Sequence, residues 1–444
     1  MKKLIYSIPI ILLISFSSCS KENETTTNKE LENKMNKIAE NYTKLVLRVG
    51  QFDPDYIDAY YGPAEWRPTV SEKDSITELN QLDIETDSLL SNMESLGNYE
   101  VDEMQTLRFK FLSKQLLSVK AKIFMLKGGE FTFDEESKAL YDAVAPTHNS
   151  EYFRNIINDL NKKLPGKGNI LNRFNDFRNR FVIPKEKLDT VFSAAINECR
   201  KITRQHIQLP ENENFHVEYV TDKAWSGYNW YKGDSYSLIQ VNTDLPIYID
   251  RAIDLAAHEG YPGHHVLNTL LDQNLFRRRG WVEFSVYPLF SPQSLIAEGT
   301  ANYGIQVVLP GEERIKFEKE ILFPLAGLDS SEADEYYEIL RLIDKLSYAG
   351  NEAARNYLDG KFNNEEAIEW LMKYSLMTRE RAEQRLKFIE KYRSYVINYN
   401  LGQDIVKEYI LSNGGIKDNP QLRWELFAKI ISTPQTPSGL DVTN

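Results

Sequence analysis

The sequence is poor in cysteine, with only two cysteines in 444 residues. One of them, Cys199, lies in a helix-like stretch and is expected to be a buried free thiol. A fold without a disulfide framework has to be stabilised by its core or by a metal ion. Hydrophobic residues make up 42% of the chain and aromatic residues 12%, so a disordered or fibrous protein is excluded.

An excess of positive charge is also missing. The 53 basic and 65 acidic residues give a net charge of −12. Proteins that bind nucleic acid usually present a basic face, so we expect no nucleic-acid partner. The acidic residues form no long block, which favours a solvated surface over an acidic tail. A repeat of fixed period is absent as well.

The apolar run near the N-terminus, residues 4–16, follows two lysines and is too short to cross a bilayer comfortably. It is typical of a secretory signal. Two serines lead directly into Cys19, an order that resembles the lipobox of bacterial lipoproteins, in which the cysteine is lipidated. We therefore predict a lipoprotein signal peptide at residues 1–19 and lipidation of Cys19. The protein would be an exported lipoprotein, facing the periplasm or the cell surface and anchored to a membrane. Ordinary cleavage that leaves Cys19 free is the alternative.

The rest of the chain is mainly helical in pattern. Residues 20–34 are polar without apolar periodicity, which predicts a flexible tether. Apolar residues then recur at helical spacing, so residues 35–209 are predicted to be an N-terminal helical region. Residues 215–219 and 236–242 alternate and are rich in β-formers, which predicts two strands. We expect a predominantly α (α+β) fold with a small β-sheet beside the helix that carries the histidine motif. Residues 210–444 would continue the same fold.

Three of the six histidines fall in the run His-Glu-Gly-Tyr-Pro-Gly-His-His at residues 258–265. In the familiar His-Glu-x-x-His motif, two imidazoles on one helix face bind zinc, and the glutamate reaches the metal-bound water. Here a regular helix would separate His258 from His264 by about 600° of rotation and about 9 Å of rise. Pro262 and Gly263 permit a bulge that can absorb the extra residues. We predict His258 and His264 as zinc ligands and Glu259 as the general base.

The choice of the second histidine leaves an alternative. His265 stands seven positions after His258, which restores the helix face but leaves the axial distance too great without the same bulge. We prefer His264, because a glycine often precedes the second ligand in zinc motifs. His265 is then expected to support a ligand or face the substrate.

A third ligand is expected from Glu298. It is the only carboxylate in an uncharged helical stretch that begins after Ser291, and an unpaired charge among apolar residues would be costly without a metal. Pairing of Glu298 with an arginine is the alternative. Asn302, one turn further on, shares its face and can orient a histidine ligand.

The motif at residues 258–265 resembles the His-Glu-x-x-Pro-Gly-His-His signature of a bacterial family known as domain of unknown function 885. The run Glu-Gly-Thr-Ala-Asn-Tyr at residues 298–303 is similar to its Glu-Gly-x-Ala-x-Tyr element, and Tyr-Asn-Leu-Gly at 399–402 is similar to its Tyr-x-x-Gly element. The resemblance covers roughly residues 35–415 and implies a zinc metallopeptidase of the gluzincin type. Gluzincins carry an aspartate four residues after the third ligand, and Asn302 takes that place here.

These residues together predict a zinc-dependent hydrolase, with a peptidase acting on extended oligopeptides as the expected form. A neutral tyrosine can stabilise the oxyanion of the tetrahedral intermediate. Tyr399 is the first candidate, because the family-like element includes it, and Tyr303 is the second.

The substrate contacts are predicted from the strand at 236–242, taken as an edge strand that pairs with a peptide. Tyr236, Asn242 and Trp230 are the candidate residues. Two alternatives stay open: a non-catalytic envelope lipoprotein that binds a peptide or a cell-envelope component, and a zinc amidase or esterase acting on another substrate. The sequence does not indicate an oligomeric state.

Overall fold

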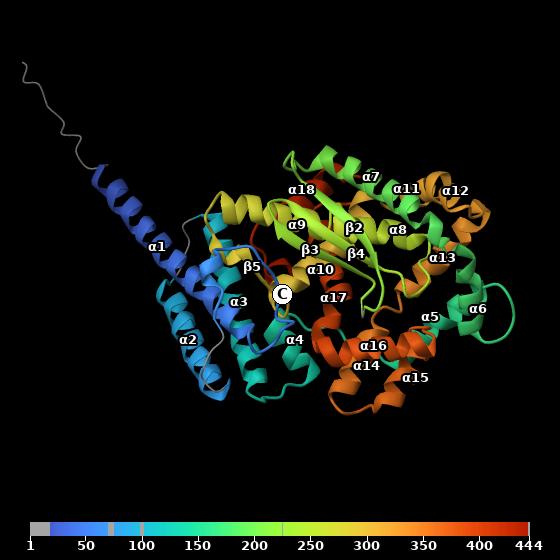
Figure 1. Ribbon diagram of the computed structural model, residues 1–444, viewed down its shortest axis with the longest axis horizontal. Helices are drawn as coiled ribbons and strands as arrows, with labels where there is room; N and C mark the ends of the chain where they lie inside the picture. Colours follow the sequence, from blue (N-terminus) through green and yellow to red (C-terminus); the bar gives the residue numbers. More distant parts are fainter. Residues whose placement is uncertain (1–17, 70–74, 98–101, 224, 443–444) are drawn as a thin grey trace, which may run out of the picture.

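The computed structural model describes residues 18–69, 75–97, 102–223 and 225–442. These residues form a predominantly helical fold with two small sheets, which confirms the predicted fold class (Figure 1). The predicted signal peptide lies outside the described residues except for its last two positions. Of the helices described, none is long and apolar enough to cross a membrane.

The α-helices are, in chain order, α1 Ser18–Val49, α2 Ser75–Ser95, α3 Glu103–Leu126, α4 Phe133–Tyr141, α5 Ser150–Lys163, α6 Ile170–Arg178, α7 Leu188–His206, α8 Asp250–Leu255, α9 His264–Leu271, α10 Pro292–Val308, α11 Glu312–Phe317, α12 Phe323–Ala326, α13 Ala333–Asp344, α14 Ala349–Leu358, α15 Asn364–Tyr374, α16 Arg379–Tyr392, α17 Ile397–Ser412, α18 Pro420–Ser432 and α19 Pro437–Leu440. The 3₁₀ turns are η1 Ala64–Trp66, η2 Asn179–Phe181, η3 Lys185–Lys187, η6 Val282–Ser285, η8 Ser330–Glu332 and η9 Arg393–Val396. The π-helical turns are η4 Ala256–Gly260, η5 Asp272–Arg277 and η7 Glu318–Leu322. The strands are β1 Ile57–Tyr60, β2 Asn214–Val220, β3 Gly227–Gly233, β4 Tyr236–Asn242 and β5 Val286–Pro288.

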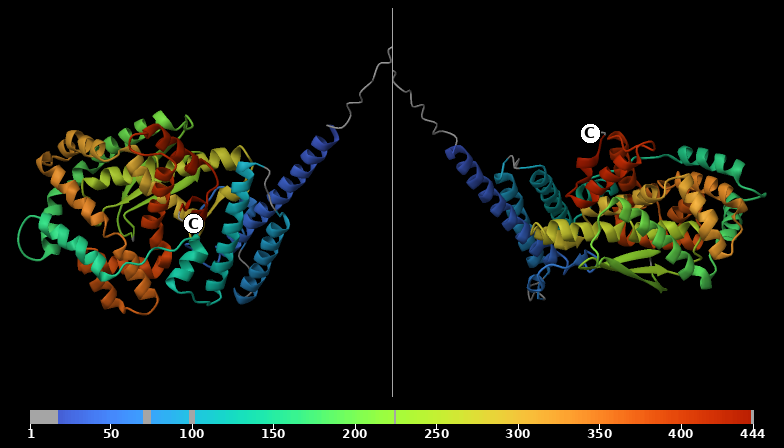
Figure 2. Two further views of the ribbon diagram at one scale, coloured as in Figure 1. Left: turned by 180° about the vertical axis from the view of Figure 1, so that it is seen from behind. Right: turned by 90° about the horizontal axis from the view of Figure 1, so that it is seen from above.

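Residues 20–34 are helical, so the prediction of a tether without regular structure is wrong for this segment. They belong to α1, which projects from one end of the body (Figures 1 and 2). The segment contains neither proline nor glycine and is rich in glutamate and lysine, which are good helix formers. Met35, Ile38 and Tyr42 pack the later turns of the same helix into the core, and helix formation propagates outward from such a packed nucleus.

The larger sheet has the strand order β2-β4-β3, with β4 parallel to β2 and antiparallel to β3. Strand β4 is therefore central, and its prediction as an edge strand is wrong. The partner on its other side is β3, which is not one of the two predicted strands. Asp234 and Ser235 both have positive φ and join β3 to β4 in a tight hairpin, a geometry that matches the twist of paired strands.

Helix α9 lies between this sheet and α18, with contacts to β3 and β4 on one side and to α18 on the other. Figure 2 shows the sheet and the C-terminal helices on opposite sides of the body. Helix α10 begins after Ser291, as predicted, and is buried along most of its length. The segment that carries the histidines is thus enclosed by packed elements on both sides.

Helices α10 and α17 cross at two glycines. A Cβ atom on Gly299 would lie 2.4 Å from the carbonyl carbon of Gly402, and one on Gly402 would lie 2.6 Å from the carbonyl oxygen of Leu295. The absence of side chains at both positions permits this close approach. The crossing brings Tyr399 on α17 to the part of α10 that carries Glu298.

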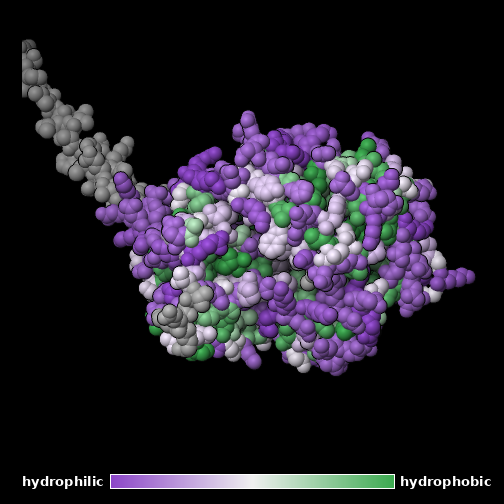
Figure 3. All heavy atoms as spheres, viewed as in Figure 1, coloured by the Kyte–Doolittle hydropathy of each residue, from purple (hydrophilic) through white to green (hydrophobic). Residues whose placement is uncertain are grey.

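Buried hydrophobic residues from Met35 in α1 to Leu440 in α19 belong to one cluster. The residue ranges 35–209 and 210–442 therefore share a core. Hydrophilic side chains cover much of the face in Figure 3, with hydrophobic side chains between them.

Candidate metal centre

The two predicted histidine ligands come together because the helix is interrupted between them. In the π turn η4, the Tyr261 N–H donates to the carbonyl oxygen of Ala256 (3.0 Å), and the Gly263 N–H donates to that of Ala257 (2.9 Å). The chain then starts a new helix, α9, at His264. As a result, the Nε2 atoms of His258 and His264 lie 3.1 Å apart.

Gly263 is essential to this turn. A Cβ atom at Gly263 would lie 1.9 Å from the carbonyl oxygen of His258 and 2.5 Å from that of Ala257. No side chain can occupy that space without a shift of the backbone. The glycine that the motif places before His264 therefore permits the close return of the chain.

Glu298 on α10 completes a group of three. Its Oε2 atom lies 3.3 Å from Nε2 of His258 and 3.7 Å from Nε2 of His264. Two ligands bound to one zinc at about 2.0–2.1 Å in tetrahedral geometry are about 3.4 Å apart. The three separations of 3.1, 3.3 and 3.7 Å scatter around that value. This donor set of two imidazoles and one carboxylate fits zinc.

A second observation supports the fit to a cation. The Oε2 atom of Glu298 is buried and has no hydrogen-bond partner. Burial raises the pKa of Glu298, but His258 and His264 lower it by more, so the net pKa lies well below its ordinary value. The carboxylate is therefore held ionised. Burial lowers the pKa of His264, yet Glu298, Glu259 and Asp58 together raise it to about 9. Negative charge is therefore concentrated around the three candidate ligand atoms, which face a common position for a cation.

Asn302 orients His258. Its Nδ2 donates to the carbonyl oxygen of Tyr399 (2.9 Å), so its Oδ1 faces Nδ1 of His258 at 3.0 Å. An amide oxygen accepts, so Nδ1 carries the proton, and Nε2 keeps its lone pair for a metal. Asn302 is placed where the sequence analysis expects it, one turn after Glu298 on the same face of α10.

The tyrosines separate into different roles. Tyr395 donates a hydrogen bond to Oε1 of Glu298 (2.8 Å), leaving Oε2 for the metal position. Tyr399 lines the cavity and has its pKa raised well above 10 by burial and by Glu298, so it is a neutral donor. Tyr303 does not line the cavity, and burial raises its pKa while the charge of Arg423 lowers it, so it is not placed to be the predicted oxyanion donor. Five residues along a helix turn a side chain about 140° away from Glu298.

His265 does not point to the other two histidines. It is buried, with Nδ1 2.8 Å from the Ser237 hydroxyl and Nε2 3.1 Å from Oε2 of Glu213. Glu213 also accepts hydrogen bonds from Tyr261 (2.6 Å), from Arg200 and from Arg204. His265 therefore ties the turn to the sheet and, through Glu213, to α7, and it is buried and does not line the cavity.

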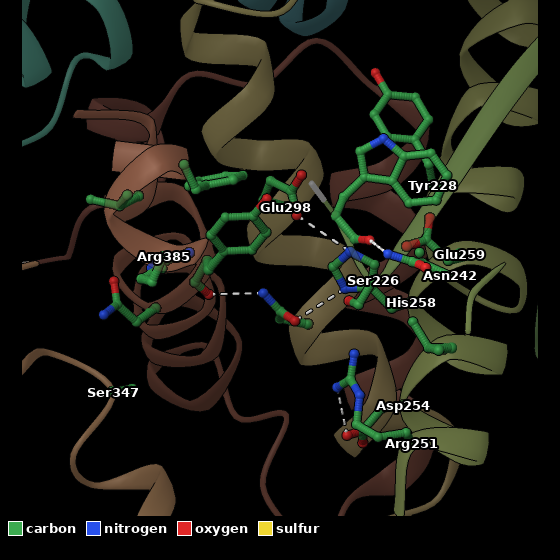
Figure 4. Close-up of a pocket in the computed structure, with 18 of the residues that line it drawn as sticks. Ser226, Tyr228, Asn242, Arg251, Asp254, His258, Glu259, Glu298, Ser347 and Arg385 are labelled. Carbon is green, nitrogen blue, oxygen red and sulfur yellow. Dashed lines mark hydrogen bonds and ion pairs between the residues drawn. The ribbon is translucent and has the colours of Figure 1, made fainter. Parts of the chain in front are cut away.

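The centre opens into a cavity of about 760 Å³ that Glu259 also lines. Figure 4 shows Glu298 and His258 between the sheet residues Tyr228 and Asn242 on one side and Arg385 on the other. The backbone oxygen of Glu259 accepts a hydrogen bond from Asn229 Nδ2 (2.7 Å). A Cβ on Gly227 would lie 2.9 Å from Oε1 of Glu259, so this glycine leaves room for the carboxylate.

The predicted substrate contacts are only partly at the cavity. Asn242 lines it, but its Nδ2 is engaged with the carbonyl oxygens of Lys223 and Trp225. Tyr236 and Trp230 do not line it; Tyr236 is exposed at the far end of β4, and Trp230 donates to Gln240. Strand β3 instead reaches the cavity through its first residues.

Three residues of this site were missed by sequence reasoning: Tyr395, Glu213 and Asp58. Asp58 on β1 lines the cavity and accepts a hydrogen bond from Tyr228. Burial raises the pKa of Asp58 to about 6, against the lowering effect of Tyr228 and His264. Nothing in the local sequence singles out these residues, because Tyr395 and Asp58 reach the cavity, and Glu213 reaches His265, from distant parts of the chain.

Comparison with solved structures identifies similar folds. A predicted lipoprotein from Colwellia psychrerythraea superposes with a TM-score of 0.51 at 16% identity, covering 82% of this chain and 68% of that chain. Metallocarboxypeptidase 1 of Trypanosoma cruzi gives a TM-score of 0.47 at 13% identity and covers 94% of both chains. The likeness to the Colwellia protein concerns the fold alone. A scan against protein-family models gives no match, and neither does a search of curated proteins. Membership of the 885 family stays a prediction.

Proposed function

We propose that this protein is a zinc-dependent hydrolase that cleaves peptide bonds. The observation that carries the proposal is the convergence of His258, His264 and Glu298, with separations of 3.1 to 3.7 Å, beside Glu259 in one cavity. A zinc ion held there supplies a Lewis acid that polarises the scissile carbonyl and makes water nucleophilic near neutral pH.

The chain's own residues supply the proton transfer and the orientation. Glu259, next to a ligand on the same turn, is positioned to accept the proton of the attacking water and to return it to the leaving amine. The neutral phenol of Tyr399 is free to donate to the oxyanion: its hydroxyl makes no hydrogen bond within the described part of the chain. Asn302 and Tyr395 hold the ligands in place.

Strand β3 offers the edge that β4 lacks. Its partner β4 occupies one side, and among the described residues no strand pairs with its other side, although β1 contacts β3. The Asn242 N–H donates to the carbonyl oxygen of Ser226, so the backbone groups of the alternate residues Gly227 and Asn229 point away from β4. These residues line the cavity. An extended peptide would add to β3 beside Glu259.

The test compares the wild type with Glu259→Gln, which keeps the shape of the side chain but cannot act as a base. We expect about one zinc per chain in both proteins, by elemental analysis, and a fall in peptide hydrolysis of about 10²-fold or more in the variant. The exposed Glu320 provides the matched control, Glu320→Gln, which should hydrolyse like the wild type. Zinc-free protein, or unchanged hydrolysis by Glu259→Gln, would contradict the proposal.

A further inference from the structure

The wall of the cavity opposite the sheet carries two arginines one helical turn apart. Arg381 and Arg385 both lie on α16 and line the same cavity as Glu298 and Glu259. Figure 4 shows Arg385 across the cavity from Tyr228 and Asn242, with Glu298 between them. A group bound at Arg385 therefore shares the cavity with the candidate metal centre.

Neither of these arginines has a carboxylate partner in the described residues. Two other arginines of the cavity do: Arg178 lies 3.5 Å from Asp250, and Arg251 lies 3.0 Å from Asp254. The side chain of Arg385 packs against the Phe388 ring, with its guanidinium carbon 4.9 Å from the ring centre. Arg381 faces the Tyr248 ring at 5.9 Å.

The environment makes this lack of a counter-ion costly. Burial lowers the pKa of Arg385. Burial also lowers the pKa of Arg381, and the positive charges of Arg178 and Arg251 lower it in addition. A partly buried cation without a counter-ion loses hydration without gaining an ion pair. An anion that enters the cavity would supply the missing partner.

Groups of opposite charge line different parts of the cavity. Glu298, Glu259 and Asp58 lie at the metal centre, and the unpaired arginines lie on the α16 wall. Groups of both signs act on the Tyr399 hydroxyl: burial and the charge of Glu298 raise its pKa, and the charge of Arg385 lowers it. A substrate with one negative end is thus oriented with that end towards α16.

We propose that Arg385, with Arg381 beside it, binds the C-terminal carboxylate of a peptide whose scissile bond lies at the His258–His264–Glu298 centre. This inference rests on the proposed hydrolase function and narrows it to cleavage near the C-terminal end. A guanidinium group presents two parallel N–H donors that match a carboxylate, and an internal stretch of peptide backbone brings no such group. An acidic side chain of the substrate is the other source of the same chemistry.

The experiment compares three peptides, which differ only at the C-terminus, on the zinc-loaded protein. The peptides end in a free alanine, in alanine amide, and in glutamate amide. Binding is measured by calorimetry on the Glu259→Gln protein, which does not consume the peptide, and kcat/KM is measured on protein with Glu259 intact. We expect the free acid to be favoured over alanine amide by about 10-fold or more in both measurements.

Arg385→Gln should reduce this preference to less than about threefold, and Arg385→Lys should leave an intermediate preference, because lysine keeps the charge but loses the fork. The exposed Arg154 provides the control: Arg154→Gln should keep the full preference. Zinc content and thermal unfolding of each variant show that the centre and the fold are intact.

The proposal would be overturned if the wild type showed the same affinity and the same kcat/KM for the free-acid peptide and for alanine amide. It would also be overturned if Arg385→Gln kept the full preference for the free acid. A preference for glutamate amide equal to that for the free acid would also overturn it, in favour of an acidic side chain. In each of these cases zinc binding and the Glu259-dependent hydrolysis of amidated peptide remain, so the proposed function is tested separately.

Discussion

The amide oxygen of Asn302 lies 3.0 Å from Nδ1 of His258, and the rest of that amide is fixed by its hydrogen bond to the backbone of Tyr399. This contact sets the tautomer of a candidate zinc ligand from a neighbouring helix. The orienting group is a neutral amide and not a carboxylate.

Asn302→Ala should weaken zinc binding by about 10- to 100-fold, because His258 loses the acceptor that fixes its ring. Asn302→Asp should bind zinc at least as tightly as the wild type, because a carboxylate raises the basicity of the imidazole. Competition with a chromogenic chelator measures both. The exposed Asn413 gives the control, Asn413→Ala, which should not change the affinity. Unchanged affinity in Asn302→Ala would refute the orienting role.

Tyr395 and Tyr399 should respond differently to the loss of their hydroxyl groups. Tyr395→Phe removes the hydrogen bond to Glu298 and should weaken zinc binding by up to about 10-fold. Tyr399→Phe should keep zinc affinity and lower kcat by about 10²-fold, because only the transition state uses its donor. The pair serves as its own control. If Tyr399→Phe lost zinc but had a normal kcat once zinc was added back, Tyr399 would hold the metal ligands and would not act in the transition state.

Gly263→Ala should disrupt the turn, since its Cβ would stand 1.9 Å from the carbonyl oxygen of His258. We expect a loss of about 1–3 kcal/mol in the free energy of unfolding, together with loss of stoichiometric zinc. Denaturant titration and elemental analysis check these. At Gly350, on α14, a Cβ would only touch Arg385 Nη2 at 3.8 Å, so Gly350→Ala should be tolerated. A zinc-loaded Gly263→Ala protein of normal stability would show that the return of the chain is not constrained as described.

Glu213 should make the stability depend on pH in the acid range. Burial raises the pKa of Glu213, but His265, Tyr261, Arg204 and Arg200 lower it to about 2 from an ordinary 4.5. The unfolded chain then binds more protons between these values, so the stabilisation is complete above pH 4.5 and is lost as the pH falls through 2.

The wild type should therefore exceed Glu213→Gln in unfolding free energy at pH 6, and this difference should shrink by about 3 kcal/mol on going to pH 2. Urea titrations at several pH values measure it. A difference that does not vary with pH would show that Glu213 acts only through packing.

The lipidation of Cys19 is testable by fractionation of cells. Cys19→Ala should abolish labelling with a fatty acid and move the protein from the membrane fraction to the soluble fraction, because a single residue carries the anchor. Cys199→Ala should do neither. Cys199 is buried, and burial raises its pKa to about 12, so it is a poor acceptor for modification. Labelling that persists in Cys19→Ala would contradict the predicted lipobox.

The sequence by itself determined the fold class and the members of the candidate centre. Helical periodicity over long stretches is a local property, and it predicted a predominantly helical chain. The histidine cluster, the Pro262–Gly263 interruption and the isolated Glu298 were visible because each departs from its local background. Even the choice of His264 depended on a local feature, the preceding glycine, and the structure brings that histidine to His258.

Only the tertiary structure decided which distant groups complete the site. The central position of β4 follows from the pairing of β3, and strand pairing is a relation between segments that neither segment encodes alone. Tyr395 reaches Glu298 because Gly299 and Gly402 let two helices cross closely, and Arg385 faces the cavity because α16 packs on its far wall. Burial and charge at these positions depend on neighbours far apart in the chain, which is why local patterns could not show them.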